Sequence, residues 1–297
     1  MNRFGKLILL SFATIIGMFF LFFYPEINGY FESVKEKTTF DNNITQIFSG
    51  SFYDSFEHHN QILDFYEKLH EDGKIGKTNK ILINIDWHSD AINTNEHITQ
   101  GTEDIYNWVN SMISENDMEG VIDEYYWVLP EASIDNVRIY KFWNTPPDKK
   151  YFGFGQPDQT FYIDKKTGEW YLEKPAGKDI REIAFHRRVL SQIESFQNTS
   201  KEIILTIDAD YFISNGYEVD GSYLYKGNEQ ELEKELIKFT QRVNDLGIKP
   251  FVIGCSYSEG YIQEKFRPII ESYFNKIGTA SVNKGEYLDS YTRTKIK

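Results

Sequence analysis

Residues 81–85 read ILINI, and residues 86–90, which follow directly, read DWHSD. The first stretch is a short apolar run of the kind that forms a strand buried in a parallel sheet. The second is acidic and carries a histidine. A similar run at 203–207, IILTI, leads into DAD at 208–210. Two buried strands that each end in carboxylates therefore indicate both the fold and the place of a candidate site.

From about residue 51 onward, strand patterns alternate with helical patterns. Short apolar runs predict strands, and apolar side chains that recur every three to four residues predict helices. The predicted strands cover 81–85, 125–129, 203–207 and 250–254, a hairpin joins 161–164 to 170–172, and the predicted helices cover 62–69, 105–112, 183–193, 231–243 and 261–274. This alternation predicts an α/β domain with a mostly parallel sheet.

The N-terminal segment predicts a membrane anchor. Residues 7–24 are an unbroken run of apolar or small residues, LILLSFATIIGMFFLFFY, close to the length that crosses a bilayer. Arg3 and Lys6 precede the run, which favours a cytoplasmic tip at 1–6 and a domain outside the cytoplasm. A cleaved signal peptide is the alternative, but no small-residue cleavage pattern follows the run. Residues 25–50 are polar and predict a stalk before a domain at 51–297.

Composition and charge exclude several classes of protein. The 297 residues are 40% hydrophobic and 16% aromatic, which is incompatible with a disordered chain. The net charge of −13 argues against a nucleic acid partner, because a phosphate-binding surface needs an excess of Lys and Arg. The single cysteine, Cys255, excludes an intrachain disulfide framework and a cysteine-based zinc site.

Both acidic segments lie where an α/β sheet binds ligands, beyond the carboxyl ends of its strands. In extended chain, residues i and i+2 point to the same side, so Asp86, His88 and Asp90 can converge, as can Asp208 and Asp210. Carboxylates gathered in this way repel one another unless a cation holds them. Imidazole and carboxylate ligands favour Mn, Fe or Zn, and bridging carboxylates favour two metals about 3.5–4 Å apart. The alternative is that these aspartates are only turn residues or helix caps.

Four short motifs resemble the arginase/agmatinase (ureohydrolase) superfamily, and in particular the formerly uncharacterised branch that includes the peptide arginases. DWHSD at 86–90 looks like the Asp-x-His-x-Asp motif, and DADYF at 208–212 looks like the Asp-x-Asp-Tyr-Phe motif. EHHNQIL at 57–63 is similar to the acidic-His-His element that precedes a helix. YWVLP at 126–130 is similar to a strand end of that branch. The resemblance spans about residues 50–265.

This resemblance implies a three-layer, arginase-like α/β/α fold that holds two divalent metal ions, which are Mn in that family. Asp86 and Asp208 would bridge the two metals. The resemblance favours His59 as a ligand, because His59 stands four residues before Leu63, as in the family's His-Asn-x-x-Leu spacing. His58 is the alternative. The six implied ligands are His59, Asp86, His88, Asp90, Asp208 and Asp210.

The implied reaction is hydrolysis of a guanidinium group, from peptidyl arginine to ornithine and urea. Two metals that share a water lower its pKa, so hydroxide forms near neutral pH and attacks the guanidinium carbon. The leaving amine needs a proton donor, for which His97 and His186 are candidates. Glu259 follows the strand at 250–254 and could pair with the cationic guanidinium.

The substrate is left open by the sequence. The glycine-rich first-His motif of cytosolic arginases is absent, and Phe212 and Ile213 do not match the Asp-Pro that usually follows the second motif. These departures and the anchor favour a peptide or cell-envelope substrate over free arginine. A deacetylase or amidase acting on envelope material is one alternative, and a non-catalytic, membrane-tethered binding protein is another. The expected partners are therefore a guanidinium or amide substrate and the lipid bilayer.

Overall fold

A computed structural model describes residues 34–57, 61–75, 80–87, 122–131, 159–167, 170–171, 173–213, 227–257 and 262–281. The predicted anchor at 7–24 and the predicted helix at 105–112 lie outside these residues. Within them, no helix combines the length and apolarity that a membrane crossing requires. The chain divides into two units, Met1–Asn43 and Ile44–Lys297, and the sheet belongs to the second. Residues 34–48, inside the predicted stalk, are helical.

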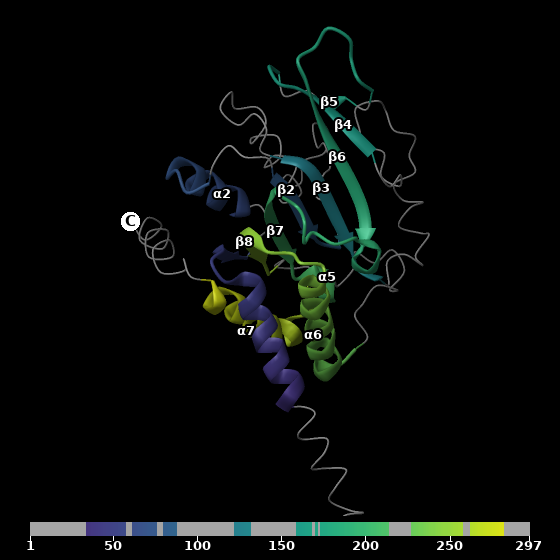
Figure 1. Ribbon diagram of the computed structural model, residues 1–297. Coiled ribbons are helices and arrows are strands. Elements are labelled where there is room, and N and C mark those ends of the chain that lie inside the picture. Colours follow the sequence, from purple (N-terminus) through teal and green to yellow (C-terminus); the bar gives the residue numbers. More distant parts are fainter. Residues whose placement is uncertain are drawn as a thin grey trace, which may run out of the picture. The chain divides into compact units, whose positions relative to one another are not determined.

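The described residues form one eight-stranded sheet with the order β1-β8-β7-β2-β3-β6-β4-β5. Along this order, every pair from β1 to β6 is parallel. The β6–β4 and β4–β5 pairs are antiparallel. The prediction of an α/β protein with a mostly parallel sheet is therefore confirmed (Figure 1). The strands are β1 (Phe52–Phe56), β2 (Lys80–Ile85), β3 (Ile122–Leu129), β4 (Gln159–Asp164), β5 (Trp170–Tyr171), β6 (Ile180–Val189), β7 (Glu202–Asp208) and β8 (Pro250–Ser256).

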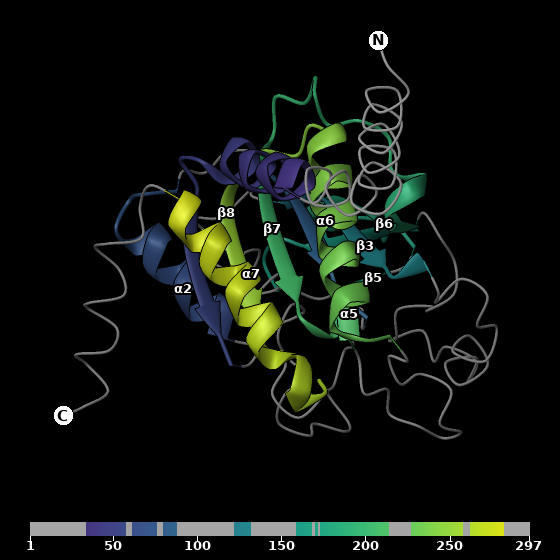
Figure 2. The same ribbon diagram turned by 90° about the horizontal axis from the view of Figure 1, so that it is seen from below.

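Helices cover both faces of the sheet. On one face, the Ile62 side chain of α2 (Gln61–Glu71) packs directly over Gly254 of β8. On the other, the Tyr53 hydroxyl of β1 donates to the Phe274 carbonyl of α7 (Arg267–Ala280) at 2.8 Å. Tyr53 is in register with Ile253, the neighbour of Gly254, so Tyr53 and Gly254 point to opposite faces. Figure 2 shows α6 (Glu229–Asp245) beside α7 on this second face.

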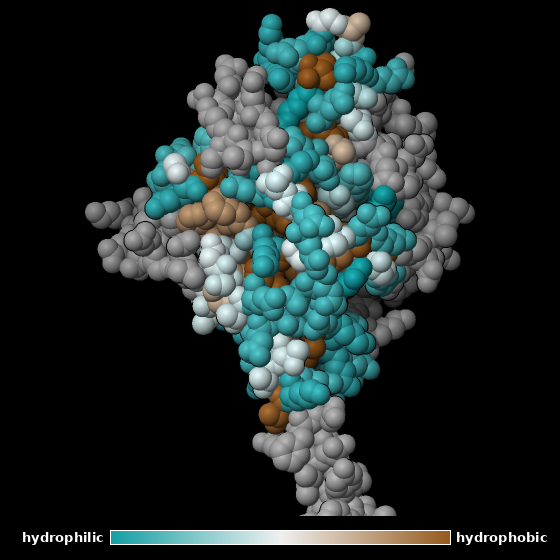
Figure 3. Space-filling view, in the orientation of Figure 1, coloured by the Kyte–Doolittle hydropathy of each residue, from teal (hydrophilic) through white to brown (hydrophobic). Residues whose placement is uncertain are grey.

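The core lies between these layers. Every residue of β2 is buried, and so is every residue of β7 after Glu202, because parallel strands are covered on both faces. Val34 is the one large hydrophobic side chain with high exposure among the described residues. The surface in Figure 3 is accordingly mostly hydrophilic over the described part of the chain.

The predicted helix at 183–193 is wrong. Residues 180–189 form β6, and a single 3-10 turn, η2 (Leu190–Gln192), follows it. β6 pairs with β3 on one side and with β4 on the other. Its sequence, IREIAFHRRV, contains good helix formers, but pairing along both edges satisfies the backbone groups and overrides that local preference.

The predicted last helix is placed too early, and β1 was not predicted at all. α7 begins at Arg267 instead of residue 261 and runs to Ala280, because Pro268 suits the first turn of a helix and a 3-10 turn, η3 (Glu264–Phe266), precedes it. β1 reads FYDSF, in which a buried Asp54 interrupts the apolar pattern. The other predicted strands and the helices α2 and α6 are confirmed.

Gly254 sets how closely α2 approaches the sheet. A Cβ at this position would lie 2.8 Å from two carbons of the Ile62 side chain. We expect Gly254→Ala to lower the free energy of unfolding by about 2 kcal/mol, because the buried Ile62 must move to admit the methyl group. Urea unfolding measures this cost. Ile62→Ala should cost less in the Gly254→Ala background than alone, and simple additivity of the two substitutions would contradict the packing described.

Asp54 is an acid buried under α2. Its side chain accepts a hydrogen bond from the Ser55 amide at 2.8 Å, and burial raises its pKa from 3.8 to about 6. Because the folded pKa is the higher one, this group's contribution to stability is present below pH 3.8 and is lost as the pH rises through 6. We expect Asp54→Asn to gain about 2 kcal/mol relative to wild type between pH 4 and pH 7, measured by urea unfolding at both values. A difference that does not change with pH would contradict this.

Candidate metal site

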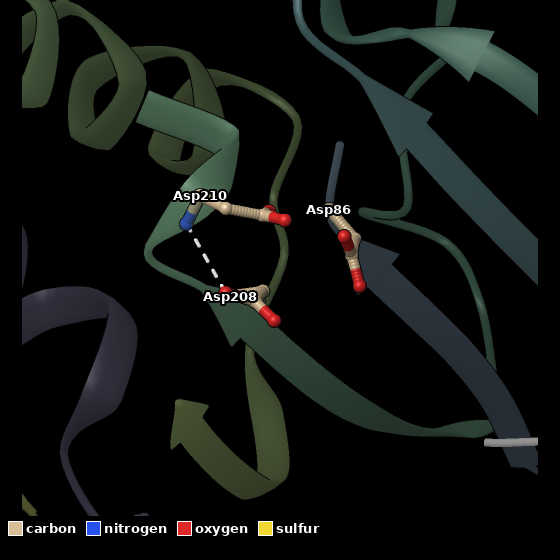
Figure 4. Close-up of side chains that lie close together, drawn as sticks. All are labelled: Asp86, Asp208 and Asp210. Atoms are coloured by element: carbon tan, nitrogen blue, oxygen red, sulfur yellow. Dashed lines mark hydrogen bonds between the residues drawn. The ribbon is translucent and has the colours of Figure 1, made fainter. Parts of the chain in front are cut away.

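Three aspartates meet at the carboxyl ends of two neighbouring parallel strands. Asp86 directly follows β2, Asp208 is the last residue of β7, and Asp210 begins the short helix α5 (Asp210–Ile213). Ligand oxygens of the three side chains all lie within 4.8 Å of one another, and all three residues are buried. Figure 4 shows the three carboxylates directed toward a common space. We call this group the Asp cluster.

Backbone amides hold two members of the Asp cluster in place. The Asp210 amide donates to Asp208 Oδ1 at 3.1 Å, and the Trp87 amide donates to Asp210 Oδ1 at 3.1 Å. The second bond links the end of β2 to the start of α5. The Ala209 amide also donates to the Ser256 carbonyl of β8 at 2.9 Å, which fixes the turn between the two aspartates.

Asp86 is held through its backbone and its side chain. Its amide donates to the Val128 carbonyl at 3.1 Å, and its carbonyl accepts from the Trp127 indole at 3.2 Å. Its Oδ2 accepts from the Asn84 side-chain amide at 3.4 Å. Residues of β3 thus hold the backbone of Asp86, and Asn84 of β2 holds its side chain.

The Asp cluster fits a divalent cation by the chemistry of its donors. Carboxylate oxygens are the ligands that hard and borderline divalent cations prefer. Buried carboxylates this close repel one another unless protons or a cation compensate. The spacing, burial and donor type therefore suit a metal ion bound between β2 and β7.

Arg267 links the residues that directly follow β1 and β8. Its Nη2 contacts both carboxylate oxygens of Glu57, at 2.7 and 2.6 Å, and its Nε donates to Glu271 at 2.9 Å. The guanidinium also lies over the Tyr257 ring, at 5.1 Å from its centre. Glu57 and Tyr257 follow β1 and β8, so Arg267 fixes the carboxyl ends of these two strands.

Of the six implied metal ligands, the structure brings together Asp86, Asp208 and Asp210. Five other candidate residues lie outside the described residues. These are the metal-ligand candidates His59, His88 and Asp90, the proton donor candidate His97 and the substrate-binding candidate Glu259; His58, the alternative to His59, lies outside them as well.

The structure does not bring His186 to the Asp cluster. His186 lies in β6, in register with Tyr126, and the two rings are 4.8 Å apart. Tyr126 is in register with Ile83, whereas the neighbouring Asn84 reaches Asp86. Because successive strand residues point to opposite faces, His186 lies on the face away from the cluster. No motif placed His186 as a proton donor, and its position in β6 does not support that role.

Sequence reasoning missed the residues that support the Asp cluster. Asn84 was counted as part of an apolar run, although it is the polar residue of that run and lies two positions before Asp86, on the same side of the strand. Thr206 has the same relation to Asp208 in β7. Both signals were present in the sequence, since polar side chains within a buried strand need partners.

Comparison with known proteins assigns no family. No protein-family model matches the chain, and a search of curated proteins finds no match. The fold and the site therefore define the protein only as a class, an α/β protein with three buried aspartates at the carboxyl ends of adjacent parallel strands.

Proposed function

We propose that this chain is a metal-dependent hydrolase of C–N bonds, and that its reaction is arginase-like hydrolysis of a guanidinium group. One observation carries the proposal: Asp86, Asp208 and Asp210 converge, buried, at the carboxyl ends of adjacent parallel strands. This edge of an α/β sheet is where ligands bind. Asp-x-His-x-Asp and Asp-x-Asp motifs begin at these same positions, and they resemble the two metal-binding motifs of the ureohydrolases.

Two divalent metal ions, Mn by the resemblance, would be held by the Asp cluster together with His59, His88 and Asp90. Bound there, they would supply an activated water and stabilise developing negative charge. Asp86 and Asp208, on the adjacent strands β2 and β7, would be among the residues that hold the ions. The hydrogen bonds to Asp208 and Asp210 hold those carboxylates in place before substrate arrives.

The chain's other candidate residues would bind the substrate and move protons. Glu259 would pair with the cationic guanidinium and orient its carbon toward the metals. His97 would donate a proton to the leaving amine. The burial of the Asp cluster excludes bulk water and strengthens these electrostatic interactions.

We propose an arginase-like, three-layer α/β/α domain, attached to the membrane by a single helix at 7–24 and a stalk. With Arg3 and Lys6 on the cytoplasmic side, the domain would lie outside the cytoplasm. A peptide or envelope-attached guanidinium compound is then the expected substrate.

The experiment is a urea-release assay on the full chain, purified in detergent and loaded with Mn²⁺. The substrates are an arginine-containing peptide, its lysine counterpart as control, and free arginine. Urea released from the arginine peptide alone is the expected result. Bound metal with no urea, but with acetate released from an acetylated amino sugar, would replace the proposal with the amidase alternative. Absence of bound metal would favour the non-catalytic binding protein.

A further inference from the structure

A chain of buried polar side chains runs beneath the Asp cluster, across three strands. Thr206 Oγ of β7 donates to Asn84 Oδ1 of β2 at 2.7 Å. The Asn84 side-chain nitrogen donates to Asp86 Oδ2 at 3.4 Å and to the Tyr125 hydroxyl of β3 at 3.2 Å. Asn84 and Thr206 have no exposed surface, and Tyr125 is nearly as buried.

The orientation of the Asn84 amide is determined by these contacts. The Asp86 carboxylate only accepts when ionised, so the nitrogen of Asn84 points toward Asp86 and Tyr125, and Oδ1 accepts from the Thr206 hydroxyl on the other side. Both hydrogens of that nitrogen then have acceptors. A buried polar network in which each member has partners is rigid, whereas a buried amide without them is costly.

The position of this network in the sheet indicates what it does. Asn84 and Thr206 are in register on adjacent strands, each two residues before an aspartate of the cluster. The rest of the β2 run is Ile81, Leu82, Ile83 and Ile85, so an apolar residue at 84 would suit the core. The polar residues Asn84 and Thr206 stand there instead, where Asn84 reaches the Asp86 carboxylate that is expected to bind metal.

We propose that Asn84 is a positioning residue for Asp86: its amide, held in place by the Thr206 hydroxyl, holds the Asp86 carboxylate toward Asp208 and Asp210. The inference rests on the proposed metal site. Groups that hydrogen-bond to metal ligands fix ligand orientation, and their loss typically lowers metal affinity about 10–100-fold. Thr206 acts on the cluster through Asn84, and its hydroxyl also lies 3.5 Å from the Ile83 carbonyl.

The test is Mn²⁺ titration of the full chain, followed by electron paramagnetic resonance, which reports the affinity and the spectrum of the bound ion. Asn84→Leu removes the amide at similar volume, and Thr206→Val removes only the hydroxyl. We expect about 10-fold weaker binding for Asn84→Leu and about 3-fold for Thr206→Val, with an altered bound-ion spectrum in both. Thr206→Val should have no further effect in the Asn84→Leu background, because it acts through the same amide.

The matched control is Thr240→Val. Thr240 in α6 is equally buried, and its hydroxyl bonds to the Leu236 carbonyl at 2.8 Å and to the Tyr273 hydroxyl at 2.9 Å, on the α7 side of the sheet. It should lower thermal stability like Thr206→Val and leave Mn²⁺ affinity unchanged. Thr206→Val decides the result if Asn84→Leu does not fold.

Three results would overturn the positioning role, and they are distinguishable. Wild-type affinity and spectrum in Thr206→Val and Asn84→Leu, with binding lost in Asp208→Asn, would refute it and leave the proposed metal site intact. Absence of Mn²⁺ binding by the wild-type chain would refute both. Weaker binding in Thr240→Val to the same extent would show that affinity follows stability alone, and would also refute the role.

Discussion

Asp208→Asn is expected to lower Mn²⁺ affinity by about 100-fold or more, because it removes the charge of a carboxylate at the centre of the Asp cluster. That loss is at or beyond the upper end of what removing a supporting partner of a metal ligand costs. Asparagine keeps the volume and an oxygen that can accept from the Asp210 amide, so the local fold should survive. Isothermal titration with Mn²⁺ measures the affinity.

The same substitution should stabilise the protein when metal is absent. Asp86, Asp208 and Asp210 have ligand oxygens within 4.8 Å of one another, and their mutual repulsion opposes folding. Removing one charge is expected to raise the free energy of unfolding by about 1–2 kcal/mol in the presence of a chelator. Opposite effects on metal affinity and on stability are what distinguish a ligand from a structural residue.

Asp164→Asn is the matched control. Asp164 is also buried, but it lies at the end of β4 in the antiparallel part of the sheet, where its Oδ1 accepts from the Lys166 amide at 2.9 Å. Its loss should lower stability and leave Mn²⁺ affinity unchanged. If both substitutions changed Mn²⁺ affinity equally, binding could not be assigned to the Asp cluster.

Glu202→Gln is expected to lower the free energy of unfolding by about 3 kcal/mol, the largest loss of stability that we predict. Lys80 and Glu202 form an ion pair between the first residues of β2 and β7, at the opposite edge of the sheet from the Asp cluster. The Lys80 side chain is fully buried, close to the Phe251 ring, whereas a third of the Glu202 side chain is exposed. Removing the carboxylate leaves a buried cation without this counter-charge, which is strongly destabilising.

Lys80→Met provides the comparison. It leaves a glutamate that water already reaches and replaces the lysine with an apolar side chain of similar length, so we expect a loss below about 1 kcal/mol. Chemical unfolding of the two variants gives the difference. A larger loss for Lys80→Met than for Glu202→Gln would contradict the asymmetric burial. Neither variant should alter Mn²⁺ affinity.

The sequence predicted the centre of the sheet better than its edges. The runs at 81–85 and 203–207 are apolar because β2 and β7 are covered on both faces, and such strands are recognisable without knowledge of their neighbours. β6 was mistaken for a helix because its strand state depends on pairing with β3 and β4, far away in the sequence. β1 was missed because, within the described part of the chain, it pairs with β8 alone and it buries Asp54.

The aspartates of the candidate site that follow strands could be predicted from the sequence. The hydrogen bonds that support them depend on which strands lie side by side. Asp86 and Asp208 could be placed at one sheet edge from the rule that parallel strands end together. Trp127 was noticed as part of a motif, but its bond to the Asp86 carbonyl depends on β3 lying beside β2. The face on which His186 points could not be predicted for the same reason, since it follows from register, which local sequence does not specify.

The central claim is that Asp86, Asp208 and Asp210 bind a divalent metal ion. Its most direct test is a crystal structure of the full chain grown with Mn²⁺, with data collected for anomalous scattering from manganese. We predict an anomalous peak between the three carboxylates, within bonding distance of an oxygen from each. A map with no peak at the Asp cluster at saturating Mn²⁺, or with peaks only elsewhere, would contradict the claim.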